Sequence, residues 1–137
     1  MVRTALFLAV LAGPGVAQDS APAGLGIALN RLDKQGEACR LTFVADNAFA
    51  PLDALVLETV MFDRAGQVAA LTLFDFGALP QDRRRVRQFD VAGLDCADLA
   101  QVLVNGVADC AGGDADAAGC AAALRVSSDL DDVEVAQ

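Results

Sequence analysis

Three kinds of side chain in this sequence have the types and spacing to do chemistry: four cysteines, a pair of nearby aspartates and a cluster of arginines. The 137-residue chain has no His, Trp or Tyr, so it lacks the commonest general base and the usual aromatic binding anchors. Nucleophiles that depend on a histidine are therefore excluded. The sequence also has no C-x-x-C redox pair, no phosphate-binding glycine motif and no cofactor fingerprint. We expect a protein that is not an enzyme and needs no cofactor.

The four cysteines all follow the N-terminal segment, and they are Cys39, Cys96, Cys110 and Cys120. An even number in a small exported domain predicts two disulfides, for which three pairings exist. Cys110 and Cys120 flank the short loop 111–119, so a local bridge is easy to form, and it leaves Cys39 to pair with Cys96. A zinc site of four cysteines is the weaker interpretation, because no two have C-x2-C spacing and an oxidising compartment disfavours free thiolates.

The loop between the last two cysteines carries carboxylates at alternate positions, as calcium-binding loops do. Asp114 and Asp116 match the first and third ligand positions, and Gly119 matches the glycine at the sixth. However, Ala118 stands at the fifth ligand position, and Arg125 stands where a bidentate Glu is needed. The pattern favours a solvated loop closed by a disulfide, with Asp114 and Asp116 as weak metal candidates.

Four of the ten basic residues lie within five positions: Arg83, Arg84, Arg85 and Arg87. Guanidinium groups bind carboxylates and phosphates through two parallel hydrogen bonds, so this arginine cluster is a candidate contact for an anionic partner. On an edge strand, the same charges would instead protect the sheet against edge-to-edge aggregation. We take the cluster as the best candidate for a contact surface, because it contrasts with the acidic remainder of the chain.

The chain as a whole is acidic, with 19 Asp and Glu against 10 Lys and Arg and a formal charge of -9. This balance argues against binding nucleic acid, which needs a basic surface, and against docking on anionic lipids. Near the C-terminus, the acidic segment 129–134 can attract cations or a basic partner, although a solvated terminus is the default interpretation. The hydrophobic content of 55% indicates a folded domain rather than a disordered chain.

The first 17 residues have the organisation of a secretory signal peptide. Arg3 supplies the positive start, residues 5–12 form a short apolar run, and a Gly-Pro-Gly sequence ends it. Gly15 and Ala17 are the small residues that signal peptidase needs, which places cleavage between Ala17 and Gln18. An apolar run of roughly ten residues is too short to cross a bilayer, which takes about 20.

No later segment is both long and apolar enough to span a membrane. We therefore expect no membrane insertion after cleavage of the signal peptide. The protein is expected to be periplasmic or secreted, with one domain over residues 18–137.

Apolar and polar residues alternate in several short segments, as is typical of half-buried strands. The alternation is clearest in 37–47, where Cys39, Leu41 and Phe43 share one face. Segment 25–29 alternates in the same way, and residues 33–36 are expected to form the turn between these two strands. Further strands are expected at 54–63, 67–76, 84–91 and 99–108, with a turn at 63–66.

Two interpretations stay open near the C-terminus. Residues 124–128 and 132–135 can pair as a last hairpin, or residues 115–124 can form a short Ala-rich helix. Segment 99–108 is apolar on both faces, which suggests a central strand between two layers. Strands of this length with turn signals between them predict an all-β antiparallel sandwich.

The segments 39–47 (CRLTFVADN) and 61–68 (MFDRAGQV) carry a resemblance to a known group of modules. With most of residues 24–110, they resemble the immunoglobulin-like or fibronectin-like modules of bacterial periplasmic proteins. The resemblance implies an immunoglobulin-like β-sandwich, although the core Trp and the tyrosine corner of antibody domains are missing. In such a sandwich the second and sixth strands begin at the same end, which adds support for a Cys39–Cys96 bridge. Such modules commonly bind partners.

These features predict an exported, non-catalytic β-sandwich that binds a protein or a cell-envelope component. Two alternatives stay open. One is a small secreted enzyme inhibitor that presents the disulfide-held loop 111–119, although this loop lacks large anchoring side chains. The other is a calcium-binding module that uses the carboxylates of Asp114 and Asp116.

Overall fold

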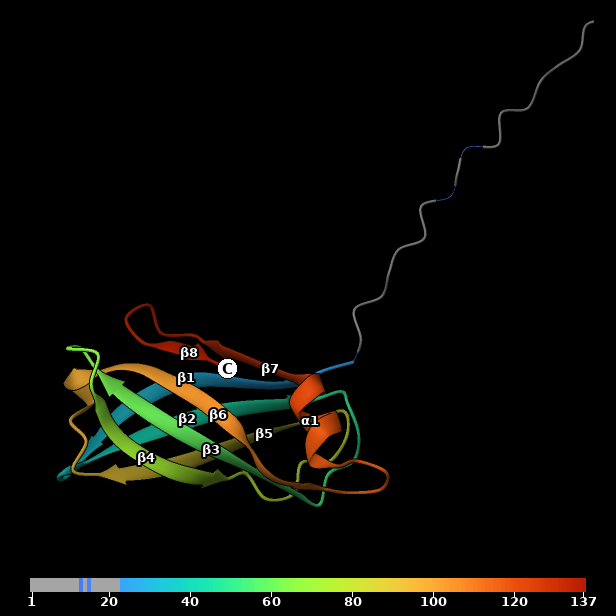
Figure 1. Ribbon diagram of the computed structural model, residues 1–137, viewed down its shortest axis with the longest axis horizontal. Helices are drawn as coiled ribbons and strands as arrows, with labels where there is room; N and C mark the ends of the chain where they lie inside the picture. The colour runs from blue at the N-terminus through green and yellow to red at the C-terminus, as the bar shows by residue number, and fades with distance from the viewer. Residues whose placement is uncertain (1–12, 14, 16–22) are drawn as a thin grey trace, which may run out of the picture.

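The computed structural model describes Gly13, Gly15 and residues 23–137, whose strands form two four-stranded β-sheets (Figure 1). The expectation of an all-β, sandwich-like architecture is confirmed, with one short α-helix beside the sheets. The expected signal peptide, with its cleavage site between Ala17 and Gln18, lies outside the described residues. In the part of the chain that is described, no helix is long and apolar enough to cross a membrane.

The first sheet has the strand order β5-β2-β1-β7. Its strands are β1 (Leu25–Gln35), β2 (Ala38–Asn47), β5 (Arg83–Ala92) and β7 (Leu124–Ser128). β2 lies antiparallel to both β1 and β5, whereas β7 runs parallel to β1. The turn between β1 and β2 is shorter than the expected turn 33–36, because Asp33 and Lys34 still pair with β2.

The second sheet has the strand order β4-β3-β6-β8. Its strands are β3 (Ala54–Asp63), β4 (Val68–Asp75), β6 (Leu99–Ala111) and β8 (Glu134–Ala136). A 3-10 helix, η1 (Cys96–Asp98), precedes β6, and the helix α1 (Ala117–Ala123) precedes β7. β4 and β5 are each at the edge of their sheet, and they lie on the same side of the molecule, the lower side in Figure 1.

The C-terminal strands differ from the expected hairpin. β7 joins the first sheet beside β1, and β8 joins the second sheet beside β6. Between them the chain crosses from one sheet to the other, and Val133 is buried on the way. The helix and the strand at 124–128 both form, because α1 ends at the residue where β7 begins. Pairing 124–128 with 132–135 was therefore the wrong expectation.

β6 lies in the interior of its sheet, between β3 and β8. Its inner face carries the buried residues Leu99, Val102 and Val104, but Asn105 and Gly106 are exposed. The expectation that segment 99–108 is covered on both faces is wrong. Many of its residues are small or β-branched, so apolar composition alone does not reveal which face is covered.

The hydrophobic core lies between the inner faces of the two sheets. Its members from β1 and β2 are those that the alternation predicts, namely Leu25, Ile27, Leu29, Cys39, Leu41 and Phe43. On the side of β4 and β5 the core ends in a cluster of four phenylalanines, Phe43, Phe74, Phe76 and Phe89, with ring centroids 4.3–6.1 Å apart. Tilted, edge-on and stacked rings of this kind add to the burial energy.

Two disulfides tie this framework together, as expected. Cys39 at the start of β2 is bonded to Cys96 in η1, with 5.1 Å between their Cα atoms. Cys110 near the end of β6 is bonded to Cys120 in α1, with 6.5 Å between the Cα atoms. The first bond links the first sheet to the connection that enters the second, and the second bond holds α1 against β6.

Candidate functional site: the arginine-rich edge strand

Strand β5 distributes the arginine cluster over two faces. Arg84 lies on the outer face of the first sheet, opposite Asp46. Arg83, Arg85 and Arg87 lie on the other face, opposite positions of β2 whose side chains are buried. Because β5 is an edge strand, these three side chains border the open side of the molecule. The structure therefore does not gather the four guanidinium groups into one cluster.

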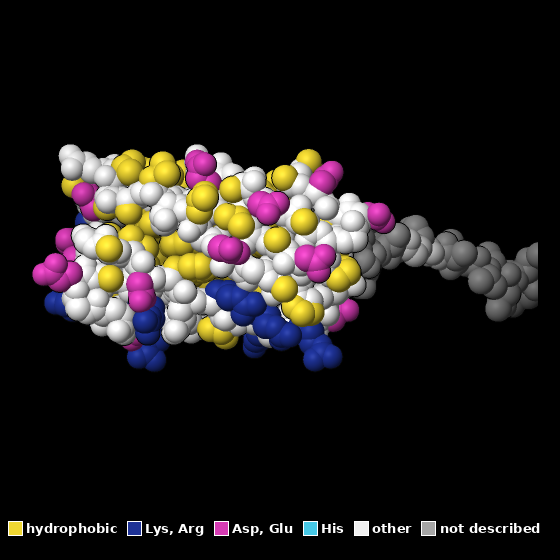
Figure 2. All heavy atoms as spheres, turned by 90° about the horizontal axis from the view of Figure 1, so that it is seen from below, with side chains coloured by type: hydrophobic (Ala, Val, Ile, Leu, Met, Phe, Trp, Pro, Cys, Tyr) yellow, Lys and Arg dark blue, Asp and Glu magenta, His cyan; other side chains and the backbone are white. Residues whose placement is uncertain are grey.

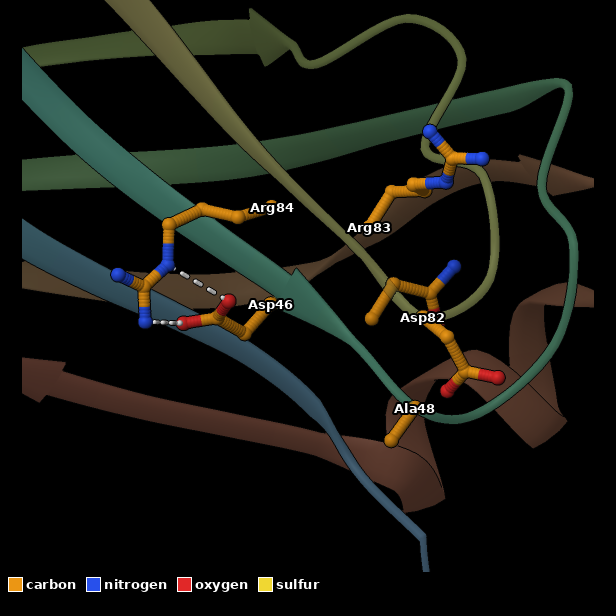
Figure 3. Close-up of a pocket in the computed structure, with 6 residues that line it drawn as sticks. Asp46, Ala48, Asp82, Arg83 and Arg84 are labelled. Carbon is orange, nitrogen blue, oxygen red and sulfur yellow. Dashed lines mark hydrogen bonds and ion pairs between the residues drawn. The ribbon is translucent and has the colours of Figure 1, made fainter.

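The outer face of β5 is neutralised by ion pairs. The Nε and Nη2 atoms of Arg84 donate to the two carboxylate oxygens of Asp46 at 2.9 and 3.2 Å (Figure 3). These hydrogen bonds raise the pKa of Arg84. At the other end of the strand, Arg40 forms the same two-pronged contact with Asp90, at 2.7 and 2.9 Å, and the hydrogen bonds lower the pKa of Asp90. Neither arginine is left with an uncompensated charge.

Arg87 has a structural contact as well as a charge. Its Nε and Nη2 atoms donate to the main-chain carbonyls of Phe76 and Ala78 at 2.7 and 2.9 Å, in the connection from β4 to β5. Its Nη1 atom donates to the carbonyl of Val86 at 3.0 Å. These acceptors are neutral dipoles, so Arg87 fixes the connection while its positive charge stays unbalanced.

Arg83 and Arg85 are the most available members of the cluster. Arg85 donates one hydrogen bond, to the carbonyl of Arg84 at 3.0 Å. Within residues 23–137, Arg83 makes no hydrogen bond, and neither arginine lies within ion-pair distance of a carboxylate. Arg83 also borders an open hollow of about 530 Å³ at the end of β2, where it turns away from Arg84 (Figure 3).

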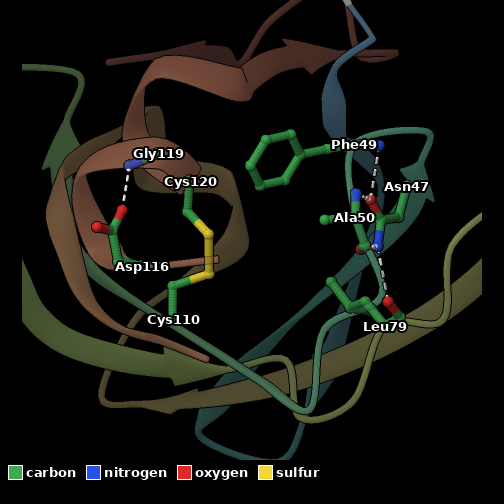
Figure 4. The surroundings of a disulfide bond; sticks show 8 residues. All are labelled: Asn47, Phe49, Ala50, Leu79, Cys110, Asp116, Gly119 and Cys120. Atoms are coloured by element: carbon green, nitrogen blue, oxygen red, sulfur yellow. Dashed lines mark hydrogen bonds between the residues drawn. A yellow bond between two sulfur atoms is a disulfide. The ribbon is translucent and has the colours of Figure 1, made fainter. Parts of the chain in front are cut away.

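The aspartate loop has a different arrangement from the calcium pattern. Asp116 is the N-cap of α1, and its Oδ1 atom accepts the main-chain N–H of Gly119 at 2.8 Å (Figure 4). Asp114 is exposed in the loop. Among the described residues, no group of three or more His, Cys, Asp or Glu side chains lies close enough to hold a metal ion.

Replacing Asp116 with alanine is expected to lower the free energy of unfolding by about 1 kcal/mol, the usual cost of losing an N-cap. The loss should be the same in calcium and in a chelator, because the carboxylate caps the helix. Thermal unfolding followed by circular dichroism measures it. A melting temperature that rises with calcium in the parent protein, but not in Asp116→Ala, would instead show a metal role.

The acidic segment 129–134 is spread over several contacts. Asp129 accepts a hydrogen bond from Asn30 at 3.1 Å, and Asp132 forms an ion pair with Arg64 at 3.4 Å. Asp131 and Glu134 are exposed. The segment therefore does not form a single acidic cluster, and two of its carboxylates help to hold the chain where it crosses between the sheets.

Asn47 supports the site, although no pattern in the sequence pointed to it. Its side chain is 2% exposed, and its Nδ2 atom donates to the carbonyls of Ala50 and Leu79, both at 2.6 Å. Its Oδ1 atom accepts the N–H groups of Phe49 and Ala50 at 3.0 and 3.3 Å (Figure 4). The signal was an Asn directly after a strand and before a turn, where its side chain can bond the main chain.

Comparison with known proteins reveals a shared fold. No protein-family model matches the chain, and no curated protein sequence matches it. The solved structure of IrmA from Escherichia coli is similar, with a TM-score of 0.53 over 82% of this chain and 91% of the IrmA chain. The two sequences are 13% identical, so the similarity concerns the fold alone.

Proposed function

We propose that this chain is an exported, non-catalytic domain of the immunoglobulin-like or fibronectin-like kind that binds a protein or a cell-envelope component through β5. The observation that carries the proposal is the row formed by Arg83, Arg85 and Arg87. None of the three has a carboxylate partner among the described residues, although the chain carries a net charge of -9. Such a row is complementary to an anionic surface and can steer its approach.

The compartment fits this proposal. Two disulfides are consistent with a periplasmic or secreted protein, because such bonds form and persist in oxidising environments. The N-terminal 17 residues independently predict export. An exported binding domain meets its partner after folding, so a rigid strand held by ion pairs and by the Arg87 contacts suits the role.

The arginine row also discourages the pairing of β5 with another sheet edge. This protective role and a binding role are compatible on one strand. They differ in what they predict, because protection requires only a charged edge, whereas binding requires a partner whose contact depends on these side chains.

A photo-crosslinking amino acid at Arg83 tests the proposal. We expect it to capture an anionic partner in cells of the source organism, with a yield that falls between low and moderate salt, because exposed charges are screened over about 8 Å at physiological salt. The matched control is the same replacement at Arg125, which is exposed on β7 at the opposite edge of the same sheet. Equal capture from both positions, or capture that ignores salt, would contradict a contact through β5.

A further inference from the structure

The two edge strands on the open side of the molecule have opposite characters. β5 begins with the arginine cluster, whereas residues 68–74 of β4 contain no charge, no Pro and no Gly. Folded proteins normally protect an exposed edge with charges, prolines or bulges, because unpaired main-chain groups are a template for another strand. β4 has a bulge at one end only, beside Phe62, so its edge over residues 70–74 is unprotected.

The free main-chain groups of β4 can be assigned to particular residues. The N–H of Phe76 donates to the carbonyl of Leu55 at 2.8 Å, so these two residues form a hydrogen-bonded pair. Such pairs alternate along an antiparallel ladder, which makes Thr72 and Phe74 bond to β3. Consistently, the hydroxyl of Thr59 in β3 donates to the carbonyl of Thr72 at 3.0 Å. Leu71 and Leu73 therefore direct their N–H and C=O groups toward the open edge.

The side chains beside this edge are apolar on both faces. Leu71 and Leu73 are 63% and 57% exposed on the outer face of the sheet. On the inner side, β4 and β5 border a groove of about 410 Å³, lined by residues 70–74 and 88–92. The stacked rings of Phe74 and Phe89, 4.3 Å apart, lie at this groove. Figure 2 views this side of the molecule and shows hydrophobic side chains along a hollow.

One end of the groove is positively charged. β4 and β5 run in opposite directions along it, so the residues that follow Phe74 in space are Arg87 and then Arg85. The contacts of Arg87 with the carbonyls of Phe76 and Ala78 hold its guanidinium at this end. Figure 2 shows Lys or Arg side chains at one end of the hydrophobic band.

We propose that β4 accepts an extended segment of a partner protein as an additional strand. The segment carries β-branched or other apolar residues beside Ala70–Phe74, followed by carboxylates that pair with Arg87 and Arg85. This inference rests on the proposed function, because it names the kind of partner that β5 attracts. A second copy of this chain is a poor occupant, since pairing two β4 edges would bring two arginine rows to the same side.

The proposal is tested with a displayed library of random 12-residue peptides, selected on the full mature protein. We expect the selected peptides to combine an alternating apolar run with two or more acidic residues at one end. Synthetic copies of the selected peptides then serve as probes for amide hydrogen exchange. Exchange at Leu71 and Leu73 should slow at least tenfold when a peptide is bound, whereas Thr72 and Phe74, already bonded to β3, should change little.

A pair of variants separates main-chain from side-chain contributions. Leu73→Pro removes an outward N–H without removing a bond to β3, and Leu73→Ala is its control for loss of the side chain. We expect Leu73→Pro to weaken peptide binding at least tenfold beyond Leu73→Ala. If Leu73→Pro does not fold, the exchange experiment on the unmodified protein decides.

Three results would overturn strand addition. Peptides that bind in a salt-sensitive manner without protecting Leu71 and Leu73 would refute it while leaving a contact through β5 intact. A library that yields no binder would also refute it, and crosslinking from Arg83 would remain the separate test of the proposed function. Protection of the two leucines by self-association, without peptide, would identify a second copy as the occupant and contradict our assignment.

Discussion

Replacing Cys39 and Cys96 together with alanine is expected to lower the free energy of unfolding by about 4 kcal/mol. The bond joins residues 57 positions apart, so its loss returns a large amount of conformational freedom to the unfolded chain. Removing the bond between Cys110 and Cys120, which are 10 positions apart, should cost about 3 kcal/mol by the same relation.

Urea unfolding followed by far-ultraviolet circular dichroism measures both losses, since the chain has no Trp or Tyr for fluorescence. The short-loop double variant serves as the control for the long-loop one. Chemical reduction of the unmodified protein should destabilise it more than either double variant. A loss below roughly 1 kcal/mol for the Cys39–Cys96 variant would show that this bond does not constrain the unfolded chain as the entropy model requires.

Replacing Asn47 with alanine should cost about 3 kcal/mol. The change removes four hydrogen bonds, and it leaves main-chain groups of Ala50 and Leu79 without partners in a buried place. Each buried polar group left unpaired costs about 1–3 kcal/mol. The loop after β2 and the turn before β5 should both loosen, which amide hydrogen exchange can detect. A loss of less than roughly 1 kcal/mol would mean that water replaces the side chain at no cost.

The Asn47→Asp variant adds a pH signature. Its carboxylate would face the carbonyl oxygens of Ala50 and Leu79, which now accept hydrogen bonds from Nδ2. Burial among acceptors disfavours the ionised form, so the pKa of the introduced carboxyl is raised in the folded state. The variant's deficit in stability should therefore be complete above that raised pKa and shrink as the pH falls through it. A deficit relative to the parent protein that does not change with pH would refute this arrangement.

Local patterns in the sequence predict the early strands well. Residues 54–63 form β3 with the expected bounds, and the alternation of Cys39, Leu41 and Phe43 identifies the buried face of β2. Each of these predictions depends on residues a few positions apart, because a strand places alternate side chains on one face. The turn at 63–66 forms for a similarly local reason, since the Oδ1 atom of Asp63 accepts the N–H groups of Ala65 and Gln67.

Contacts between distant segments are the part that local patterns do not predict. β7 and β8 pair with β1 and β6, about 100 and 30 residues earlier in the chain, and nothing in 124–135 encodes that choice. The arginine cluster reads as one charged run in the sequence. Its division into a neutralised Arg84 and a structural Arg87 depends on Asp46 and on the carbonyls of the preceding connection. A run of charges shows where a strand is exposed, but not which charges stay available.

The central claim is that Arg83 and Arg85 form the contact of a binding domain, and paired charge reversals test it most directly. Arg83→Glu with Arg85→Glu is compared with Arg31→Glu with Arg125→Glu, which changes the net charge equally at other strands of the same sheet. With the crosslinked partner, the first variant should associate about tenfold more slowly, dissociate within roughly twofold of the parent rate, and melt normally. Normal association of that variant with faster aggregation would contradict the claim and leave the arginines as edge protection alone.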